Sequence, residues 1–254
     1  SLNEGKVTIV AGFQGVSQDT KDITTLGRGA SDTTAVALAA ALNADYCEIY
    51  SDVDGVYTAD PRIAPSARQI REIGYEDMME MAASGAKILH LRFVEFARRE
   101  NVPVHVRSSF TDKQGTWVRN QDEINRDETM EQAIITGIAH DRGEAKITVV
   151  GVPDRVGEAA AIFTAVADAD VNIDMIVQNI SRLSDVKTDI SFTLPMSDGA
   201  KAIAAIEAVK DAVGFEELLY DDQIGKVSAV GVGMRSHPGV SATFFRALAE
   251  ADVN

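Results

Sequence analysis

The stretch KITVVGVPDRVGEAAAIFTAVADADVN, residues 146–172, recurs at the end of the chain as KVSAVGVGMRSHPGVSATFFRALAEADVN, residues 226–254. Each copy predicts a strand, a glycine-containing loop, a helix and the start of another strand. The second copy has two extra residues before its loop glycine, Gly239, which corresponds to Gly157. Agreement over this length indicates an internal repeat, and the repeat fixes the architecture of the segment that contains it.

The chain after the first copy completes one folding unit. The apolar pattern predicts strands over residues 173–180, 188–194 and 217–220, with a helix over residues 199–213. Together with the first copy this gives the order βαββαβ, the ferredoxin-like arrangement. We place this unit at residues 133–222 and the second copy at residues 223–254. The second copy stops where its second strand should begin and the chain opens without methionine, so we expect a fragment of a longer protein.

The first half of the chain alternates strands with helices. Such alternation over residues 1–118 predicts an α/β layered domain with a largely parallel sheet. Ser31 or Asp32 can cap the first of the helices. The polar, charge-rich stretch RNQDEINRDETMEQ, residues 119–132, predicts a linker. The expected strands cover residues 6–13, 46–50, 104–108 and 116–118, and the expected helices cover residues 33–42, 76–83 and 86–99.

The composition argues against several classes of protein. The 254 residues carry a formal net charge of −15, whereas a nucleic-acid-binding protein needs a basic face. No apolar run approaches the ~20 residues of a membrane span. The single cysteine, Cys47, cannot form an internal disulfide and lies in an apolar stretch. We therefore expect a globular protein with a buried cysteine in a reducing, cytoplasmic setting.

The stretch TTLGRGASDTTAVALAA, residues 24–40, runs from glycine-rich sequence into a helix pattern. Glycines let the backbone approach a ligand closely, and the free N–H groups at a helix start attract an anion. Arg28 can bind a carboxylate through two hydrogen bonds. Asp32 would repel a phosphate unless a cation lay between them, so the pattern suggests a site where an acidic substrate meets a phosphate. A capped helix behind a flexible loop explains the same spacing, and both interpretations stay open.

A second loop, SDVDGVYTADPR at residues 51–62, directly follows a predicted strand. Loops after parallel strands are the usual ligand positions in open α/β sheets. In this loop Asp52 can accept a hydrogen bond from a hydroxyl or an amine, Tyr57 can stack on a base, and Arg62 can reach a phosphate. A turn-rich loop without a ligand is the alternative. Lys87, taken alone, indicates only a solvated lysine.

The glycine loops of the two repeats, residues 153–157 and 236–239, also join a strand to a helix. Their backbone N–H groups can bind the carboxylate of a free amino acid, with Asp154 accepting a hydrogen bond from its ammonium group. A tight turn without a ligand is again the alternative.

Six motifs taken together resemble the aspartate kinase family. They follow the family's order along the whole chain: TTLGRGASDTTA, YSDVDGVYTADPR, GAKILH, PVHVRSS, VGVPDRVGEAA and VGVGMRSHPGV. The similarity is greatest to the lysine- and threonine-regulated bacterial type with tandem ACT domains. It implies that residues 1–118 are the C-terminal part of an amino acid kinase domain, an αβα sandwich. It also implies that the repeats are ACT domains, the second of them truncated.

The resemblance implies a reaction and its ligands. The γ-phosphoryl group of MgATP would pass to the side-chain carboxylate of L-aspartate, giving 4-phospho-L-aspartate. This is the first step toward lysine, threonine, methionine and diaminopimelate. Threonine and lysine are the expected effectors, and a homodimer or an αβ hetero-oligomer is the expected assembly.

The motif match also assigns roles to individual residues, and it implies no metal ligand supplied by the protein. Asp32 falls on the family's catalytic aspartate. The positions that bind substrate are Phe13, Arg28, Gly29 and Ser31. Those that bind ATP are Ser51, Asp52, Tyr57, Arg62 and Lys87. Those that bind the effector are Asp154, Gly157, Ala159 and Gln178, with Asn254 on the facing module.

Two departures from the family pattern change the expectation for this chain alone. Ala30 replaces the second glycine of the family's GRGGSD motif, and the N-terminal Lys-Phe/Tyr-Gly-Gly motif is absent. We therefore predict little or no kinase activity from the chain by itself. The alternatives are a regulatory subunit that senses an amino acid and a kinase for glutamate or a nucleotide. The kinase motifs disfavour the first of these, and the ACT repeat disfavours the second.

Overall fold

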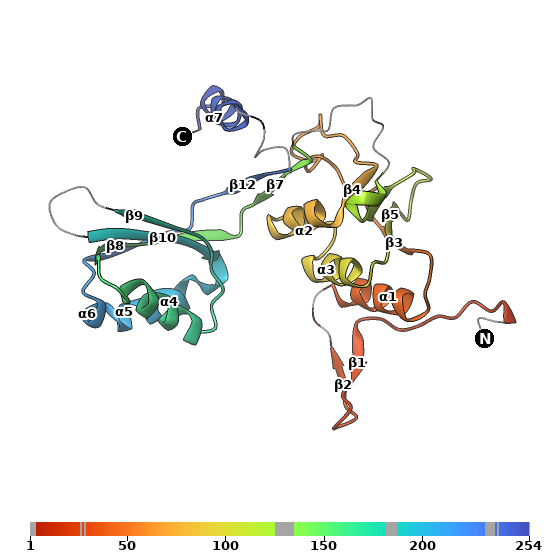
Figure 1. Cartoon of the computed structure of the whole chain (residues 1–254), viewed down its shortest axis with the longest axis horizontal. Helices are drawn as coiled ribbons and strands as arrows, with labels where there is room; N and C mark the ends of the chain where they lie inside the picture. Colours follow the sequence, from red (N-terminus) through yellow and green to blue (C-terminus); the bar gives the residue numbers. More distant parts are fainter. Residues whose placement is uncertain are drawn as a thin grey trace. The chain divides into compact units, whose positions relative to one another are not determined.

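The computed structural model describes residues 4–25, 27, 29–124, 135–180, 187–231, 237 and 239–253 (Figure 1). Contacts between residues divide the chain into two compact units. Unit 1 contains residues 1–140 and 227–254, and unit 2 contains residues 141–226. Within the described residues, no helix is both long enough and apolar enough to cross a membrane.

Unit 1 is built around a four-stranded sheet. The strand order is β3-β5-β6-β4, in which β3 pairs with β5 and β4 pairs with β6 in parallel, while β5 and β6 are antiparallel. The predicted α/β class with a largely parallel sheet is confirmed. The strands are β3 (Cys47–Ser51), β4 (Glu72–Gly74), β5 (Val104–Ser108) and β6 (Thr116–Arg119).

Three helices share one apolar core with this sheet. They are α1 (Ala30–Ala41), α2 (Tyr75–Ala83) and α3 (Leu91–Arg99). Alternate residues of a strand point to the same face, and those of β5 and β6 that face the helices are fully buried. The core includes Val36, Met78, Phe93, Val104, Val106 and Val118. Cys47 is buried in the same core, as the sequence predicted.

Shorter elements complete unit 1. The strands β1 (Gln14–Val16) and β2 (Ile23–Thr25) form an antiparallel hairpin. The strand β7 (Gly137–Asp141) pairs with β12 (Lys226–Val230), and the Thr136 amide donates to the Val230 carbonyl over 2.7 Å. The 3-10 turn Gln121–Glu123 and the helix α7 (Val240–Glu250) are the remaining elements.

The structure corrects three expectations for the first half of the chain. Residues 6–13 are not a strand: no described strand pairs with them, and Val7 and Ile9 are each 94% exposed. An apolar run becomes a strand only where a neighbour takes its backbone hydrogen bonds. The first helix begins three residues earlier than predicted, and its N-cap is Gly29 rather than Ser31 or Asp32. Residues 86–90 precede α3 instead of opening it, because the His90 backbone is extended.

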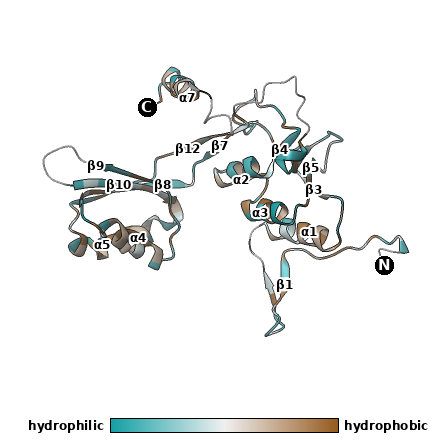
Figure 2. Cartoon of the chain, viewed as in Figure 1, coloured by the Kyte–Doolittle hydropathy of each residue, from teal (hydrophilic) through white to brown (hydrophobic). Residues whose placement is uncertain are grey.

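Unit 2 has the predicted βαββαβ order and sheet. Its strands are all antiparallel in the order β11-β8-β10-β9, which confirms the ferredoxin-like arrangement. The helices that supply much of its core, α4 and α5, are drawn in pale to brown shades in Figure 2. The elements are β8 (Glu144–Pro153), α4 (Glu158–Asp168), β9 (Asp174–Ile180), β10 (Lys187–Pro195), a 3-10 turn (Met196–Asp198), α5 (Gly199–Ala208), α6 (Lys210–Val213) and β11 (Glu217–Asp221).

The sequence repeat is also a repeat of backbone conformation. Gly157 and Gly239 cap α4 and α7 with φ values of 105° and 98°. Each helix is followed by an aspartate with positive φ, 55° at Asp170 and 57° at Asp252. Residues that correspond in the alignment of the two copies therefore make the same turns.

Candidate functional site

The start of α1 brings together three separate segments of the chain. Gly29, the N-cap, has a φ of 74°, and a Cβ placed on it would overlap the His90 ring at 2.6 Å from Cγ. A Cβ on Gly12 would lie 3.2 Å from the Cα of Ser31. The backbone at Gly12, the first turn of α1 and the residue before α3 therefore pack closely enough to exclude side chains between them.

This arrangement leaves a helix start that suits an anion. The N-cap Gly29 has no side chain to offer, and the first-turn N–H groups at Ser31 and Asp32 have no intrahelical partner. The helix dipole adds partial positive charge at the same place. Phe13 follows Gly12, has a φ of 69° and is 48% exposed. The structure thus gathers three of the five residues predicted for the aspartate site, Gly29, Ser31 and Asp32; Phe13 is next in sequence to Gly12, and Arg28 lies outside the described residues.

Asp32 is the acidic group of this assembly. Burial raises the pKa of its carboxyl above the usual value, and the nearby His90 lowers it by a smaller amount. His90 was not singled out from the sequence, because it lies about sixty positions after Gly29, and only the folded chain brings the two residues together. The folded chain therefore keeps an acidic group at a partly desolvated helix start, an arrangement that is common at functional sites.

We expect Asp32→Asn to make the folded chain more stable at neutral pH. The raised pKa means that the ionised carboxylate is disfavoured in the folded state. This cost is present above the folded pKa and absent below the unfolded pKa of about 4. Thermal unfolding at about pH 7.5 should show a higher midpoint for the variant, and the difference should vanish at about pH 3.5. Asp19→Asn, in the exposed β1–β2 turn, is the control. A lower midpoint for Asp32→Asn at neutral pH would show that the ionised Asp32 carboxylate does not destabilise the folded chain.

Gly29→Ala is expected to disrupt the start of α1. The positive φ alone costs an alanine about 1 kcal/mol, and overlap with the His90 ring adds to it. Gly27→Ala is the matched control, since Gly27 has a φ of +87° and a Cβ placed on it would have no atom within 4 Å. Chemical denaturation should show a larger loss for Gly29→Ala than for Gly27→Ala. Adding His90→Ala should recover the difference. Equal losses for the two glycine variants would show that the ring does not pack there.

The predicted nucleotide loop leaves the carboxyl end of β3. Ser51 pairs with Ser108 at the end of β5, and its hydroxyl donates to Asp52 over 3.1 Å. Arg62 binds Asp60 with two hydrogen bonds of 3.0 and 2.8 Å. These bonds lower the pKa of Asp60 to about 2, so the pair is ionised at every physiological pH. The Arg62 side chain is 85% exposed, which leaves its other N–H groups facing solvent.

Two further predicted residues differ in their surroundings. Tyr57 is half-buried: its backbone bridges to Gln69, and its hydroxyl donates to Asp54 over 3.4 Å. Lys87 is exposed in the segment before α3, and the structure joins it to neither of the two loops. Among the described residues, no group of three or more His, Cys, Asp or Glu side chains is arranged to hold a metal ion.

The predicted effector residues lie at one end of the unit 2 sheet. Asp154 and Gly157 are exposed in the loop between β8 and α4, and Ala159 is in the first turn of α4. Val152, at the end of β8, pairs with Thr188, to which Gln178 donates over 3.4 Å. Gln178 therefore belongs to the same end of the sheet as the loop. Asn254 lies outside the described residues.

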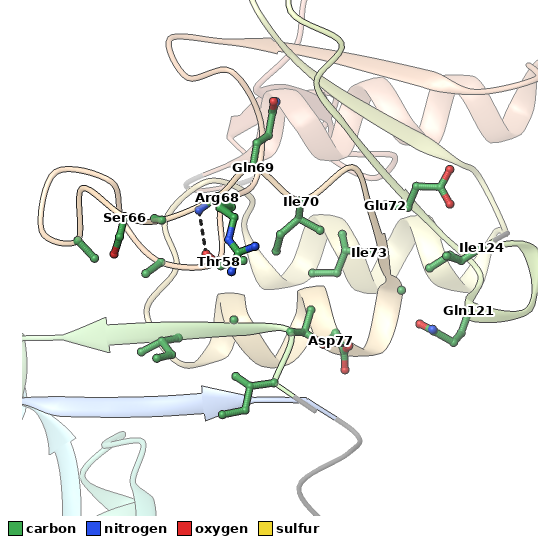
Figure 3. Close-up of a pocket in the computed structure, with 18 residues that line it drawn as sticks. Thr58, Ser66, Arg68, Gln69, Ile70, Glu72, Ile73, Asp77, Gln121 and Ile124 are labelled. Carbon is green, nitrogen blue, oxygen red and sulfur yellow. Dashed lines mark hydrogen bonds between the residues drawn. The ribbon is translucent and has the colours of Figure 1, made fainter. Parts of the chain in front are cut away.

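A cavity of about 830 Å³ lies elsewhere in unit 1 (Figure 3). It is lined by one side of the loop 58–70, by β4, by the start of α2 and by residues from 121–124 and 135–138, and by none of the predicted site residues. Two of its polar contacts are internal: Thr136 donates to Asp77 over 2.6 Å, and the Arg68 amide donates to the Thr58 hydroxyl over 3.0 Å. The cavity is thus separate from the assembly at α1.

Family models match both parts of the chain. The model of the amino acid kinase family matches residues 1–108, and an ACT domain model matches residues 147–209 and 227–254. The chain is 63% identical to an aspartokinase of Mycolicibacterium smegmatis over all 254 residues. It spans 60% of the length of that relative.

Two solved structures of E. coli aspartokinase III are similar to this chain, each at 30% identity. One is the complex with aspartate and ADP in the R state, with a TM-score of 0.74 over 93% of this chain and 51% of that one. The other is the complex with lysine and aspartate in the T state, with a TM-score of 0.63 over 87% of this chain and 47% of that one. The similarity therefore includes both the kinase part and the part that follows it.

Proposed function

Because this chain belongs to the aspartokinase family, we propose that it forms the aspartate- and ATP-binding part of a cytoplasmic aspartate kinase together with its ACT regulatory segment. The proposed reaction moves the γ-phosphoryl group of MgATP to the side-chain carboxylate of L-aspartate. The observation that carries the proposal is the assembly at the start of α1, where Gly29, Ser31 and Asp32 meet Gly12 and His90. The amino acid kinase match over residues 1–108 favours an enzyme over a purely regulatory subunit.

The chemistry needs positioning and charge neutralisation more than proton transfer. A carboxylate oxygen of aspartate attacks the γ-phosphorus, and the bond to the oxygen that bridges the β- and γ-phosphorus atoms breaks to release ADP. The attacking carboxylate carries no proton at neutral pH, so no general base is required. The α1 N-terminus would bind the substrate carboxylate, and Asp32 would pair with a cationic group, other than a metal ion, that lies against the transferring phosphoryl group. The loop 51–62, with Arg62, and Lys87 would bind the nucleotide.

Hydroxylamine trapping of aspartyl phosphate tests the proposal. The 254-residue chain is assayed with MgATP and aspartate, first by itself and then after extension by the N-terminal segment that precedes the match in the M. smegmatis relative. We expect product from the extended protein, little or none from the chain alone, and much less product with glutamate. No product from the extended protein would contradict the proposal, and full turnover by the chain alone would contradict its predicted inactivity.

We propose that the β8–α4 loop binds an amino acid effector, threonine or lysine, in a homodimer or an αβ assembly. The positive end of α4 and the exposed carboxylate of Asp154 can bind the two charged groups of a free amino acid. The E. coli structure that contains lysine supports an amino acid ligand in this family. An effector that binds one arrangement of the modules more tightly than another would shift activity by that difference in affinity.

Asp154→Ala is expected to weaken effector binding at least about tenfold, the usual size of a lost charge-assisted hydrogen bond. Calorimetric titration of the extended protein with threonine and with lysine measures this loss. Glu207→Ala, an exposed acid on α5 of the same unit, should leave the affinity unchanged. Unchanged affinity in Asp154→Ala would remove Asp154 from the site.

A further inference from the structure

Asp54 lies in the loop after β3 and joins two segments that are far apart in sequence. Its carboxylate accepts hydrogen bonds of 2.6 Å from the Thr111 hydroxyl and 2.6 Å from the Lys113 ammonium group, and a longer one of 3.4 Å from Tyr57. Its backbone carbonyl accepts a 2.6 Å bond from the Gln69 side chain. A turn at Asp54-Gly55 needs none of these tertiary bonds, so their number calls for another explanation.

The sheet brings the two segments together. β3 and β5 are parallel and end side by side, with Ser51 opposite Ser108 and the Ser109 amide donating to the Ser51 carbonyl over 2.8 Å. The loop 52–62 and the loop 109–115 therefore leave the same edge of the sheet. The carboxyl edge of parallel strands is where open α/β sheets bind ligands. Asp54 is the described side chain through which Thr111 and Lys113 of the second loop bond to the first.

The charges at this edge favour a fixed arrangement. The hydrogen bond from Lys113 lowers the pKa of Asp54, so its carboxylate is ionised at neutral pH. The Asp54 side chain is 18% exposed, whereas that of Lys113 is 59% exposed. One N–H of the ammonium group is fixed by Asp54, and the other two remain available to a ligand.

We propose that Asp54 is a positioning residue of the nucleotide site. It holds the loop 51–62 and the segment 111–113 as one surface at the carboxyl edge, and it orients Lys113 as a further cation for the polyphosphate of a nucleoside triphosphate. This inference rests on the proposed function, which assigns the loop 51–62 to ATP. The sequence motifs did not assign a role to Asp54, Thr111 or Lys113.

The competing explanation is a surface ion pair that holds a loop and does nothing else. An exposed pair of this kind contributes little to stability. The two explanations therefore differ in nucleotide affinity rather than in unfolding, and the test needs both measurements.

The experiment compares Asp54→Asn, Lys113→Gln and the double variant in the extended protein. Asp112→Asn is the matched control, because it removes the same charge as Asp54→Asn from the neighbouring residue of Lys113, and Asp112 is exposed. Calorimetry measures the affinity for MgATP, steady-state kinetics separate KM for ATP from KM for aspartate, and thermal unfolding measures stability.

We expect each single variant to weaken MgATP binding about tenfold and to raise KM for ATP while KM for aspartate stays unchanged. The double variant should be no weaker than the worse single variant, because the two residues act as one unit. Asp112→Asn should bind MgATP normally.

Normal MgATP affinity in Asp54→Asn would overturn the positioning role, as would an equal loss for ATP and aspartate together with a lower unfolding temperature. The proposed function would survive both results, since the unchanged protein would still bind MgATP. Failure of the unchanged extended protein to bind MgATP would instead overturn the nucleotide site itself, and the role of Asp54 with it.

Discussion

Asp32→Asn is expected to lower kcat of the extended protein by at least about 100-fold, the usual size of a lost charge at a phosphoryl-transfer site. The variant keeps the shape of the side chain but lacks the negative charge that would pair with a cationic group beside the transferring phosphoryl group. Since the proposed nucleotide loop, residues 51–62, does not include Asp32, KM for ATP should change little. The hydroxamate assay at saturating aspartate and MgATP measures the loss.

Two observations make this result specific. Asp45→Asn, an exposed acid just after α1, should retain full activity. Asp32→Asn should also be the more stable protein at neutral pH, because burial raises the pKa of Asp32. A substitution that removes activity and raises stability identifies a group kept for function. More than a tenth of the activity remaining in Asp32→Asn would show that the helix start binds substrate without help from this carboxylate.

Thr116→Val is expected to destabilise unit 1 by about 2–4 kcal/mol. The Thr116 side chain is fully buried; its hydroxyl accepts from the Val56 amide over 2.9 Å and donates to the Ile70 carbonyl over 2.6 Å. Valine fills nearly the same space but makes neither bond, so it leaves one buried donor and one buried acceptor without partners. Each such group costs about 1–3 kcal/mol.

Urea unfolding followed by the fluorescence of Trp117, the only tryptophan, measures this loss. Thr116→Ser is the matched control, since it keeps the hydroxyl and removes only a methyl group at a cost of about 1 kcal/mol. Val56 and Ile70 hold the two ends of the loop that contains Tyr57 and Arg62, so Thr116→Val should also weaken MgATP binding. Equal stability of the valine and serine variants would mean that the hydroxyl does not support this loop.

The elements predicted well from sequence are those whose apolar pattern is strict and local. The strand β5 was predicted with its observed bounds, residues 104–108, and the βαββαβ order of unit 2 followed from the repeat. The strand expected at residues 6–13 was wrong, because the pattern reports apolar side chains and not whether another strand accepts their hydrogen bonds. The start of α1 was misplaced for a related reason: Gly29 caps the helix through its positive φ, not through a side chain.

The residues of the candidate site also differ in whether the sequence could predict them. Gly29, Ser31 and Asp32 were predicted because they are close in sequence and share one motif. His90, Lys113 and Thr116 were missed because each reaches its partner across about sixty residues, a separation that no local motif records. The roles of Asp154, Gly157, Ala159 and Gln178 remain predictions.

The pairing of β7 with β12 has a consequence for engineering. Thr136 bonds to Val230, so the start of β7 lies beside the end of β12, and their opposite ends at Asp141 and Lys226 face each other. The intervening residues form their own core, which makes them a cassette inserted between two neighbouring strands. A short glycine-serine bridge could replace such a cassette, or the cassette of another family member could be grafted there, without lengthening the path between the strands. The segment that contains the proposed effector loop between β8 and α4 could then be exchanged as a module while unit 1 stays the same.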